Sequence, residues 1–198
     1  MNTGPLTSER ILEAAEETLR RFGPAKTTVV DVARALGVSH GSVYRHFPTK
    51  AALRDAVVSE WLERSHARLA AIAQEDGPAA DRLERLIRAL KEWKWAQALD
   101  DPDVFSAYAV LAADAGDAIT THVDYVVARI AEIVVDGVRR GEFASEDPQR
   151  TARAVMDATG RFHNPAHRDE WQQPTMSAAF DGVWELILNG LVPPKGAG

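Results

Sequence analysis

A run of hydrogen-bonding side chains between residues 39 and 50 offers the clearest chemistry in this sequence. Its members are hydroxyl, imidazole, phenol and cationic groups with one glycine among them: Ser39, His40, Gly41, Ser42, Tyr44, Arg45, His46 and Lys50. Tyrosine and histidine suit phosphate oxygens, whereas arginine can reach a phosphate or the acceptor edge of guanine. The small residues at positions 41 and 42 would let a base edge approach closely. This chemistry is that of nucleic-acid recognition.

No grouping of residues indicates catalysis. The chain has no cysteine, which excludes disulfides, thiolate metal sites and cysteine nucleophiles. We find no nucleophile–base–acid arrangement and no glycine-rich phosphate loop, so we expect no enzyme and no cofactor. His163 and His167 are four residues apart, as metal ligands on a helix can be, but Asn164 and Pro165 break the helix between them. We therefore predict a loop there rather than a metal site.

Helix signals place the polar run on the second of two short helices. Thr28 starts a helix over residues 29–36, and Gly37 ends it. Ser39 caps the next helix, over residues 40–47. A helix, a tight glycine-containing turn and a second short helix form the layout of a helix-turn-helix, whose second helix enters the major groove of DNA.

The spacing of apolar residues predicts which side of the second helix faces outward. Val43 and Phe47 are four residues apart and should face inward, toward the first helix. The outward set is then Gly41, Ser42, Tyr44, Arg45 and His46. Thr28 and Lys50 stand at helix starts, where free N–H groups favour a phosphate. The alternative is an ordinary helical hairpin, with Tyr44 and His46 as surface packing residues.

Charge is distributed unevenly along the chain, whose net charge is −6. Residues 1–50 hold seven Lys/Arg and five Asp/Glu, and the rest holds 16 and 24. Between Thr18 and Lys50 there are six basic residues and one acidic residue. A mildly basic end on an acidic body could bind a polyanion at that end only.

The remainder of the chain is predicted to be helical, since strand signals are nearly absent. Besides a first helix over 7–22, we expect helices at 50–73, 79–98, 103–114, 117–140, 148–162 and 175–191. Residues 1–50 would form one domain, packed on the helix 50–73, and residues 51–198 the other. No membrane-length apolar run and no secretory leader are visible, so we predict a cytoplasmic protein without a membrane partner.

Residues 27–53 resemble the DNA-binding signature of the TetR family of bacterial transcriptional regulators. The elements that match are the T-x-x-D-V-A entry from Thr28, the G-V-S-x-G turn from Gly37, the Y-x-H-F end from Tyr44, and Lys50. The resemblance implies an all-α fold: a three-helix, homeodomain-like helix-turn-helix head followed by a five- to six-helix ligand-binding and dimerisation bundle.

The resemblance further implies a homodimer that binds a palindromic operator and is released by a small, largely apolar effector. The last two helices, 148–162 and 175–191, would then form the dimer interface. Its predicted residues are Val155, Thr159, Trp171, Phe180, Val183, Trp184 and Ile187. An alternative function is a DNA-binding structural or division-control factor of the same fold without a small-molecule ligand.

Aromatic residues of the body are candidate walls for the effector. They are Trp93, Trp95, Phe105, Tyr108, Tyr125 and Phe162. Trp93 falls on the apolar stripe of its helix, while Trp95 points roughly 200° away, so both cannot belong to one small core layer. The other interpretation is that these residues are simply core.

Overall fold

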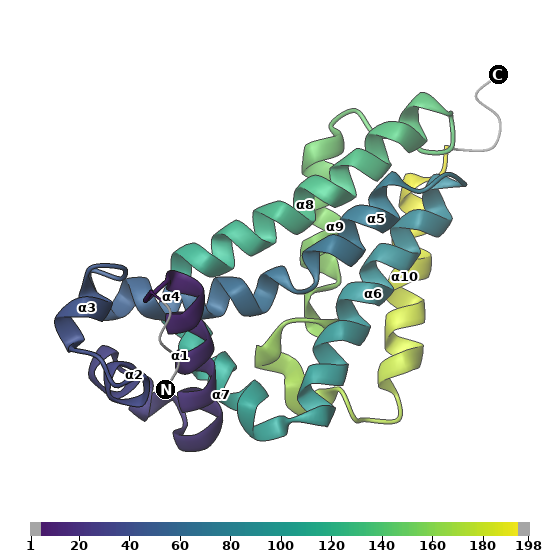
Figure 1. Cartoon of the computed structure of the whole chain (residues 1–198). Coiled ribbons are helices and arrows are strands. Elements are labelled where there is room, and N and C mark those ends of the chain that lie inside the picture. Colours follow the sequence, from purple (N-terminus) through teal and green to yellow (C-terminus); the bar gives the residue numbers. More distant parts are fainter. Residues whose placement is uncertain (1–4, 194–198) are drawn as a thin grey trace. The chain divides into compact units, whose positions relative to one another are not determined.

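The protein is all-α over residues 5–193, the part of the chain that the computed structural model describes (Figure 1). It divides into two compact units. Unit 1 runs up to Glu63 and also includes Asp100–His122, whereas unit 2 comprises Arg64–Leu99 and the residues from Val123 on. The sequence predicted a domain boundary at residue 50. Unit 1 extends past that position and also takes in a later segment of the chain.

Unit 1 is built on short helices with well-defined ends. Its helices are α1 (Ser8–Phe22), η1 (Pro24–Lys26), α2 (Val29–Leu36), α3 (His40–Tyr44), α4 (Lys50–Glu63), α7 (Pro102–Ala113) and the first residues of α8 (Gly116–Arg139). The apolar stripe of α1 is buried, with Ile11 fully inaccessible and Leu19 1% exposed. Trp61 of α4 stacks on Tyr108 of α7, with ring centroids 4.7 Å apart. This core holds α7 against the N-terminal helices.

Unit 2 is a helical bundle around one apolar core. Its helices are α5 (His66–Gln74), α6 (Ala79–Asp100) as far as Leu99, α8 from Val123, α9 (Pro148–Ala158), η2 (Gly160–Phe162), η3 (Pro165–Glu170) and α10 (Met176–Leu191). Leu83, Leu86, Ile87 and Leu90 of α6 are fully buried in this core. α10 lies beside α6, where Arg88 Nη2 is 3.0 Å from Asp181 Oδ1 (Figure 1).

Three predicted helices end earlier than the sequence indicated. The helix expected over 50–73 is two helices, since α4 ends at Glu63 and α5 begins at His66. No glycine or proline marks this break, so periodicity alone could not find it. α3 ends at Tyr44 rather than residue 47, because both His46 N and Phe47 N bond to the Val43 carbonyl in a closing turn. The helix from 148 ends at Ala158.

No helix within residues 5–193 is both long enough and apolar enough to span a lipid bilayer.

Candidate nucleic-acid interface

Local hydrogen bonds fix the angle between α2 and α3. Thr28 Oγ1 accepts from Asp31 N at 3.2 Å and caps α2. Gly37 ends α2 in the left-handed conformation, with φ of 67°, which a glycine adopts without steric cost. Ser39 Oγ then accepts from Ser42 N at 3.2 Å and caps α3. The turn therefore has a defined geometry, and α3 is presented as a rigid element.

The two sides of α3 have opposite character, as the spacing predicted. Val43 is fully buried and Phe47 is 8% exposed, and α3 packs against α2, whose Val32 and Ala33 are also buried. His40, Gly41, Arg45 and His46 are exposed, and Ser42 and Tyr44 are half-buried. Arg45 and His46 follow the helix in its closing turn rather than lying within it. The outer side therefore carries the hydrogen-bonding side chains, and the buried residues on the inner side anchor the helix.

Contacts among the outer residues orient several of these donors. Arg45 Nη2 donates to Ser42 Oγ at 3.3 Å, and Ser42 Oγ lies 2.9 Å from Ser39 Oγ. The rings of His40 and Tyr44 meet edge to face, with centroids 6.4 Å apart. Each of these side chains is positioned by a neighbour while it remains accessible.

His46 is tied to the first helix of the chain. Its Nδ1 lies 3.3 Å from Ser8 Oγ at the start of α1. The Glu9 carboxyl has a lowered pKa, first because of its hydrogen bond to a backbone N–H and then because of Thr7, with a smaller contribution from the His46 charge. The contact with Ser8 therefore links the His46 imidazole to the start of α1.

Glycine at position 41 is not required by the packing of the protein itself. A Cβ added there would meet only Ser39 Oγ, at 3.8 Å, which is ordinary van der Waals contact. Its φ is not positive, so the backbone conformation does not require glycine either. Glycine in a helix costs roughly 0.5–1 kcal/mol relative to alanine. An external partner that approaches α3 closely would account for that cost.

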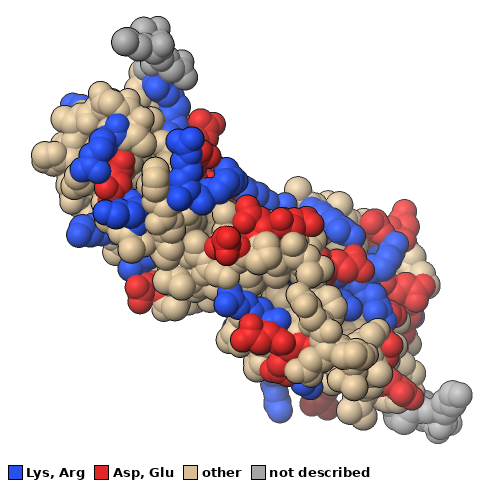
Figure 2. All heavy atoms as spheres, turned by 90° about the horizontal axis from the view of Figure 1, so that it is seen from below, with Lys and Arg blue, Asp and Glu red and all other residues tan. Residues whose placement is uncertain are grey.

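The basic residues between Thr18 and Lys50 are all exposed, and they divide into two groups. Arg20 and Arg21 pair with carboxylates of α1, and Arg34 pairs with Asp31 at 2.9 Å. The remaining three, Lys26, Arg45 and Lys50, are in no ion pair within the described residues. Figure 2 shows the Lys and Arg side chains over unit 1, on the left of that view. Lys26, at the end of η1, is a cation that the motif analysis did not single out.

Comparison with known families identifies the two parts of the chain. A family model described as "Bacterial regulatory proteins, tetR family" matches residues 11–57, which include α2 and α3. A second model, "Tetracyclin repressor-like, C-terminal domain", matches residues 79–184, more than half of the chain. The chain belongs to the TetR family. Members of this family are DNA-binding transcriptional regulators, and the segment of this TetR-family protein that matches the first model contains both α2 and α3.

Individual relatives agree with this assignment. The chain is 35% identical over 135 residues to the HTH-type transcriptional regulator CymR of Pseudomonas putida, covering 66% of this chain and 62% of CymR. It is 28% identical over 170 residues to the repressor Rv1474c of Mycobacterium tuberculosis, covering 75% and 88%. The fold is shared with SmeT, the repressor of a Stenotrophomonas maltophilia multidrug efflux pump, at a TM-score of 0.64 and 17% identity over 96% of this chain and 92% of SmeT.

The six aromatic residues predicted to line an effector site lie in both units. Phe105 and Tyr108 pack on Trp61 within unit 1. The other four, Trp93, Trp95, Tyr125 and Phe162, lie in unit 2. There the structure brings two of them together, because Trp95 Nε1 donates to the Phe162 carbonyl at 2.8 Å. Tyr125 stacks on His66 with a centroid distance of 3.8 Å. The effector role of the six remains a prediction.

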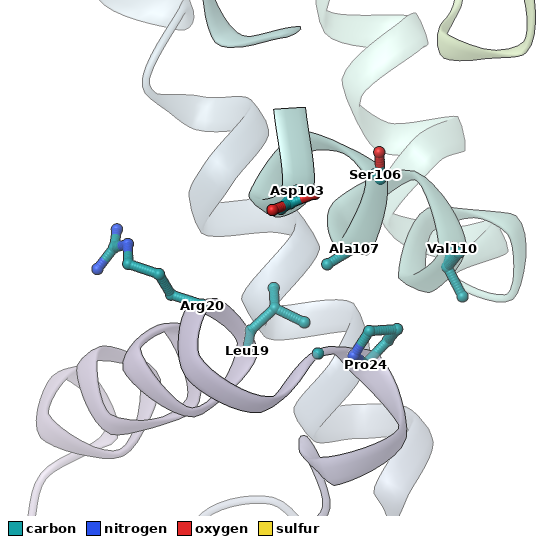
Figure 3. Close-up of a pocket in the computed structure, with 8 residues that line it drawn as sticks. Leu19, Arg20, Pro24, Asp103, Ser106, Ala107 and Val110 are labelled. Atoms are coloured by element: carbon teal, nitrogen blue, oxygen red, sulfur yellow. The ribbon is translucent and has the colours of Figure 1, made fainter. Parts of the chain in front are cut away.

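Two surface pockets are lined by none of these aromatic residues. A pocket of about 240 Å³ lies in unit 1 between the end of α1 and α7. In Figure 3, Leu19, Pro24, Ala107 and Val110 form its apolar walls, with Arg20 and Asp103 beside them. The second, of about 500 Å³, lies at the start of α6 and is lined mainly by charged residues.

Most residues predicted at the dimer interface are buried inside the protomer. Val155, Thr159, Trp171, Phe180 and Trp184 are each at most 5% exposed, and Val183 and Ile187 are half-buried. A residue that is buried in its own chain cannot present its side chain to a partner. On the opposite side of α10, Ala178, Gly182, Leu186 and Gly190 are exposed, with Leu186 74% exposed. The interface prediction was based on the apolar stripe of α10, and periodicity alone could not tell whether that stripe faces the protomer core or a partner.

The two histidines with metal-ligand spacing are not brought together. His163 is 6% exposed and its Nε2 lies 3.2 Å from Thr159 Oγ1. His167 Nδ1 instead lies 2.9 Å from Glu170 Oε1. Across residues 5–193, no three or more His, Asp or Glu residues are grouped as a metal site would require.

Proposed function

We propose that this protein is a ligand-responsive transcriptional repressor that binds a palindromic operator as a homodimer and is released by a small, largely apolar effector. The observation that carries the DNA-binding part is the outer side of α3, where exposed donors stand over the buried residues Val43 and Phe47. The family membership supports regulation, and the helical bundle of unit 2 is the part available for an effector and a partner chain.

In the proposed complex α3 lies in the major groove. Tyr44 and His46 donate to phosphates, and Arg45 reaches either a guanine edge or a phosphate. Thr28 and Lys50 bracket the motif at the starts of α2 and α4, where backbone N–H groups point toward an anion. Asp31 has a lowered pKa, first because Thr28 donates to it, so it stays ionised and pairs with Arg34.

The dimer is proposed to form through the exposed side of α10. Ala178, Gly182, Leu186 and Gly190 recur at four-residue spacing, and a Cβ added at either glycine would meet nothing within 4 Å. Such a stripe allows two helices to approach closely around Leu186. A two-fold dimer presents two α3 helices, so it binds a palindrome only when the half-sites match their spacing. Effector binding would favour a population with a different spacing.

Salt-dependent binding to a selected operator tests the DNA assignment. Lys50→Ala should weaken binding across sequences and reduce the slope of log affinity against log salt by about one unit. Arg68→Ala is the matched control, because Arg68 is also exposed and cationic but lies in unit 2 and pairs with Glu92. An unchanged slope in Lys50→Ala, together with unchanged affinity in Tyr44→Ala, whose neutral side chain should affect the affinity but not the slope, would overturn the phosphate contacts. A protein that binds no duplex DNA would overturn the function.

A further inference from the structure

One side-chain contact joins the helix-turn-helix motif to a residue far outside it. Ser8 Oγ, on the first turn of α1, lies 3.3 Å from His46 Nδ1, 38 positions later in the chain. The start of α1 does not depend on this hydroxyl, because Thr7 Oγ1 accepts from Arg10 N at 3.3 Å and caps the helix. The Ser8 hydroxyl instead reaches the imidazole that we expect to contact a phosphate.

This contact decides which nitrogen of His46 can meet DNA. In a neutral imidazole one nitrogen carries the hydrogen and donates, whereas the other accepts. When Nδ1 accepts from the Ser8 hydroxyl, the hydrogen is on Nε2. His46 is exposed, so its Nε2–H group can donate to a phosphate oxygen. In the opposite tautomer, Nε2 would present a lone pair, which a phosphate oxygen repels.

A hydroxyl can keep the ring in this orientation whether the imidazole is neutral or charged. Serine donates to Nδ1 of a neutral ring and, after rotation of its O–H, accepts from Nδ1–H of a protonated ring. Glu9, the next residue of α1, acts on the same imidazole. The pKa of its carboxyl is lowered first by a backbone hydrogen bond, then by Thr7, and to a smaller extent by the His46 charge. The start of α1 therefore offers His46 both a hydroxyl and a carboxylate.

We propose that Ser8 is a positioning residue of the DNA interface, whose hydroxyl holds the His46 ring so that Nε2–H is directed at a phosphate of the operator. This inference rests on the proposed function and adds to it a residue that lies outside the motif. A side chain held in its bound orientation loses less conformational freedom when the complex forms. Removal of the hydroxyl should therefore weaken operator binding by about 2- to 10-fold.

A double-mutant cycle tests whether Ser8 acts through His46. Fluorescence anisotropy with labelled operator gives the affinities of wild type, Ser8→Ala, His46→Ala and the double variant. Ser8→Ala should weaken binding when His46 is present and have no effect when residue 46 is alanine. Ser8→Thr keeps the hydroxyl and should bind as wild type does. Thr121→Ala is the control, because Thr121 carries an exposed hydroxyl on α8 in the same unit, and its affinity should be unchanged.

Nitrogen NMR of the imidazole tests the contact without DNA. Neutral His46 should carry its hydrogen on Nε2 in the wild type, and Ser8→Ala should shift the ring toward a mixture of tautomers. Identical His46 spectra in the two proteins would reject the inference. A Ser8→Ala penalty of the same size with and without His46 would reject it as well, since Ser8 would then act by another route.

The outcomes separate this inference from the proposed function. If wild type and Ser8→Ala bind the operator equally well, Ser8 has no positioning role and the proposed function stands. If the NMR spectra show the contact between Ser8 and His46 but no duplex DNA is bound, the proposed function fails, and the role of Ser8 in DNA binding fails with it.

Discussion

Replacing Gly41 by alanine should strengthen the fold and weaken DNA binding, and these opposite effects test why glycine is there. The added Cβ meets only Ser39 Oγ, at 3.8 Å, so it introduces no clash inside the protein. Alanine is favoured over glycine in a helix by roughly 0.5–1 kcal/mol. For a chain of this size, that gain corresponds to an increase of about 1–4 °C in the unfolding temperature.

The same methyl group projects from the exposed side of α3. In a complex where α3 fills the major groove, it would occupy space needed by a base edge. Forcing an extra methyl into a well-packed contact costs roughly 1–3 kcal/mol, which is about 5- to 150-fold in affinity. Gly41→Ser should be worse than Gly41→Ala, because its side chain is larger.

Two measurements on the same samples show whether stability and DNA affinity change in opposite directions in Gly41→Ala. Thermal unfolding reports the stability, and fluorescence anisotropy with labelled operator reports the affinity. Gly116→Ala is the matched control, because Gly116 begins α8 in the same unit and has nothing within 4 Å of an added Cβ. It should be similarly stabilised and bind DNA normally. Undiminished affinity in Gly41→Ala would refute the close approach of DNA at this residue.

Three further substitutions probe unit 2. Leu186→Glu should turn a dimer into a folded monomer, because Leu186 is 74% exposed in the protomer and two carboxylates would meet at the interface; sedimentation that still shows a dimer would exclude this side of α10. Phe180→Asp, at 1% exposure, should unfold the protein instead. Burial, followed by the charge of Lys94, lowers the pKa of His163 from 6.5 to about 4. As the pH falls, His163 is therefore protonated in the unfolded state at a higher pH than in the folded state, which destabilises the fold. Between pH 6.5 and 4, the free energy of unfolding of the wild type should therefore fall by about 3 kcal/mol more than that of His163→Gln. Chemical denaturation at several pH values measures both proteins. An equal fall in the two would contradict this prediction.

The parts of the fold predicted most accurately from the sequence are those set by neighbouring residues. The limits of α2 agree to the residue, because Thr28 and Gly37 act on backbone groups only a few positions away. The inner side of α3 was predictable for the same reason, since helical spacing alone places Val43 and Phe47 together. The function followed from a motif within this locally determined segment.

Features that depend on distant parts of the chain were not predictable. Periodicity identified an apolar stripe on α10, but core and dimer interface give the same stripe, and only burial showed that Phe180 and Trp184 face their own chain. The break between α4 and α5 lacks glycine and proline, so it carries no local signal. The aromatic residues of α7 were grouped with those of α6 by composition, whereas the fold packs Tyr108 on Trp61.

Two buried lysines of α6 are another feature that the sequence analysis did not predict. A residue rule based on hydropathy assigns Lys91 and Lys94 to the solvent side of α6, and the sequence analysis therefore passed over them. The apolar stripe nevertheless continues through position 94, since Leu86 and Leu90 precede it at four-residue spacing and are fully buried. A charged residue that continues a core stripe contradicts the local pattern at a cost in stability. Only the packing of the neighbouring helices shows that Lys94 is buried, so its position could not be predicted from the sequence of α6 alone.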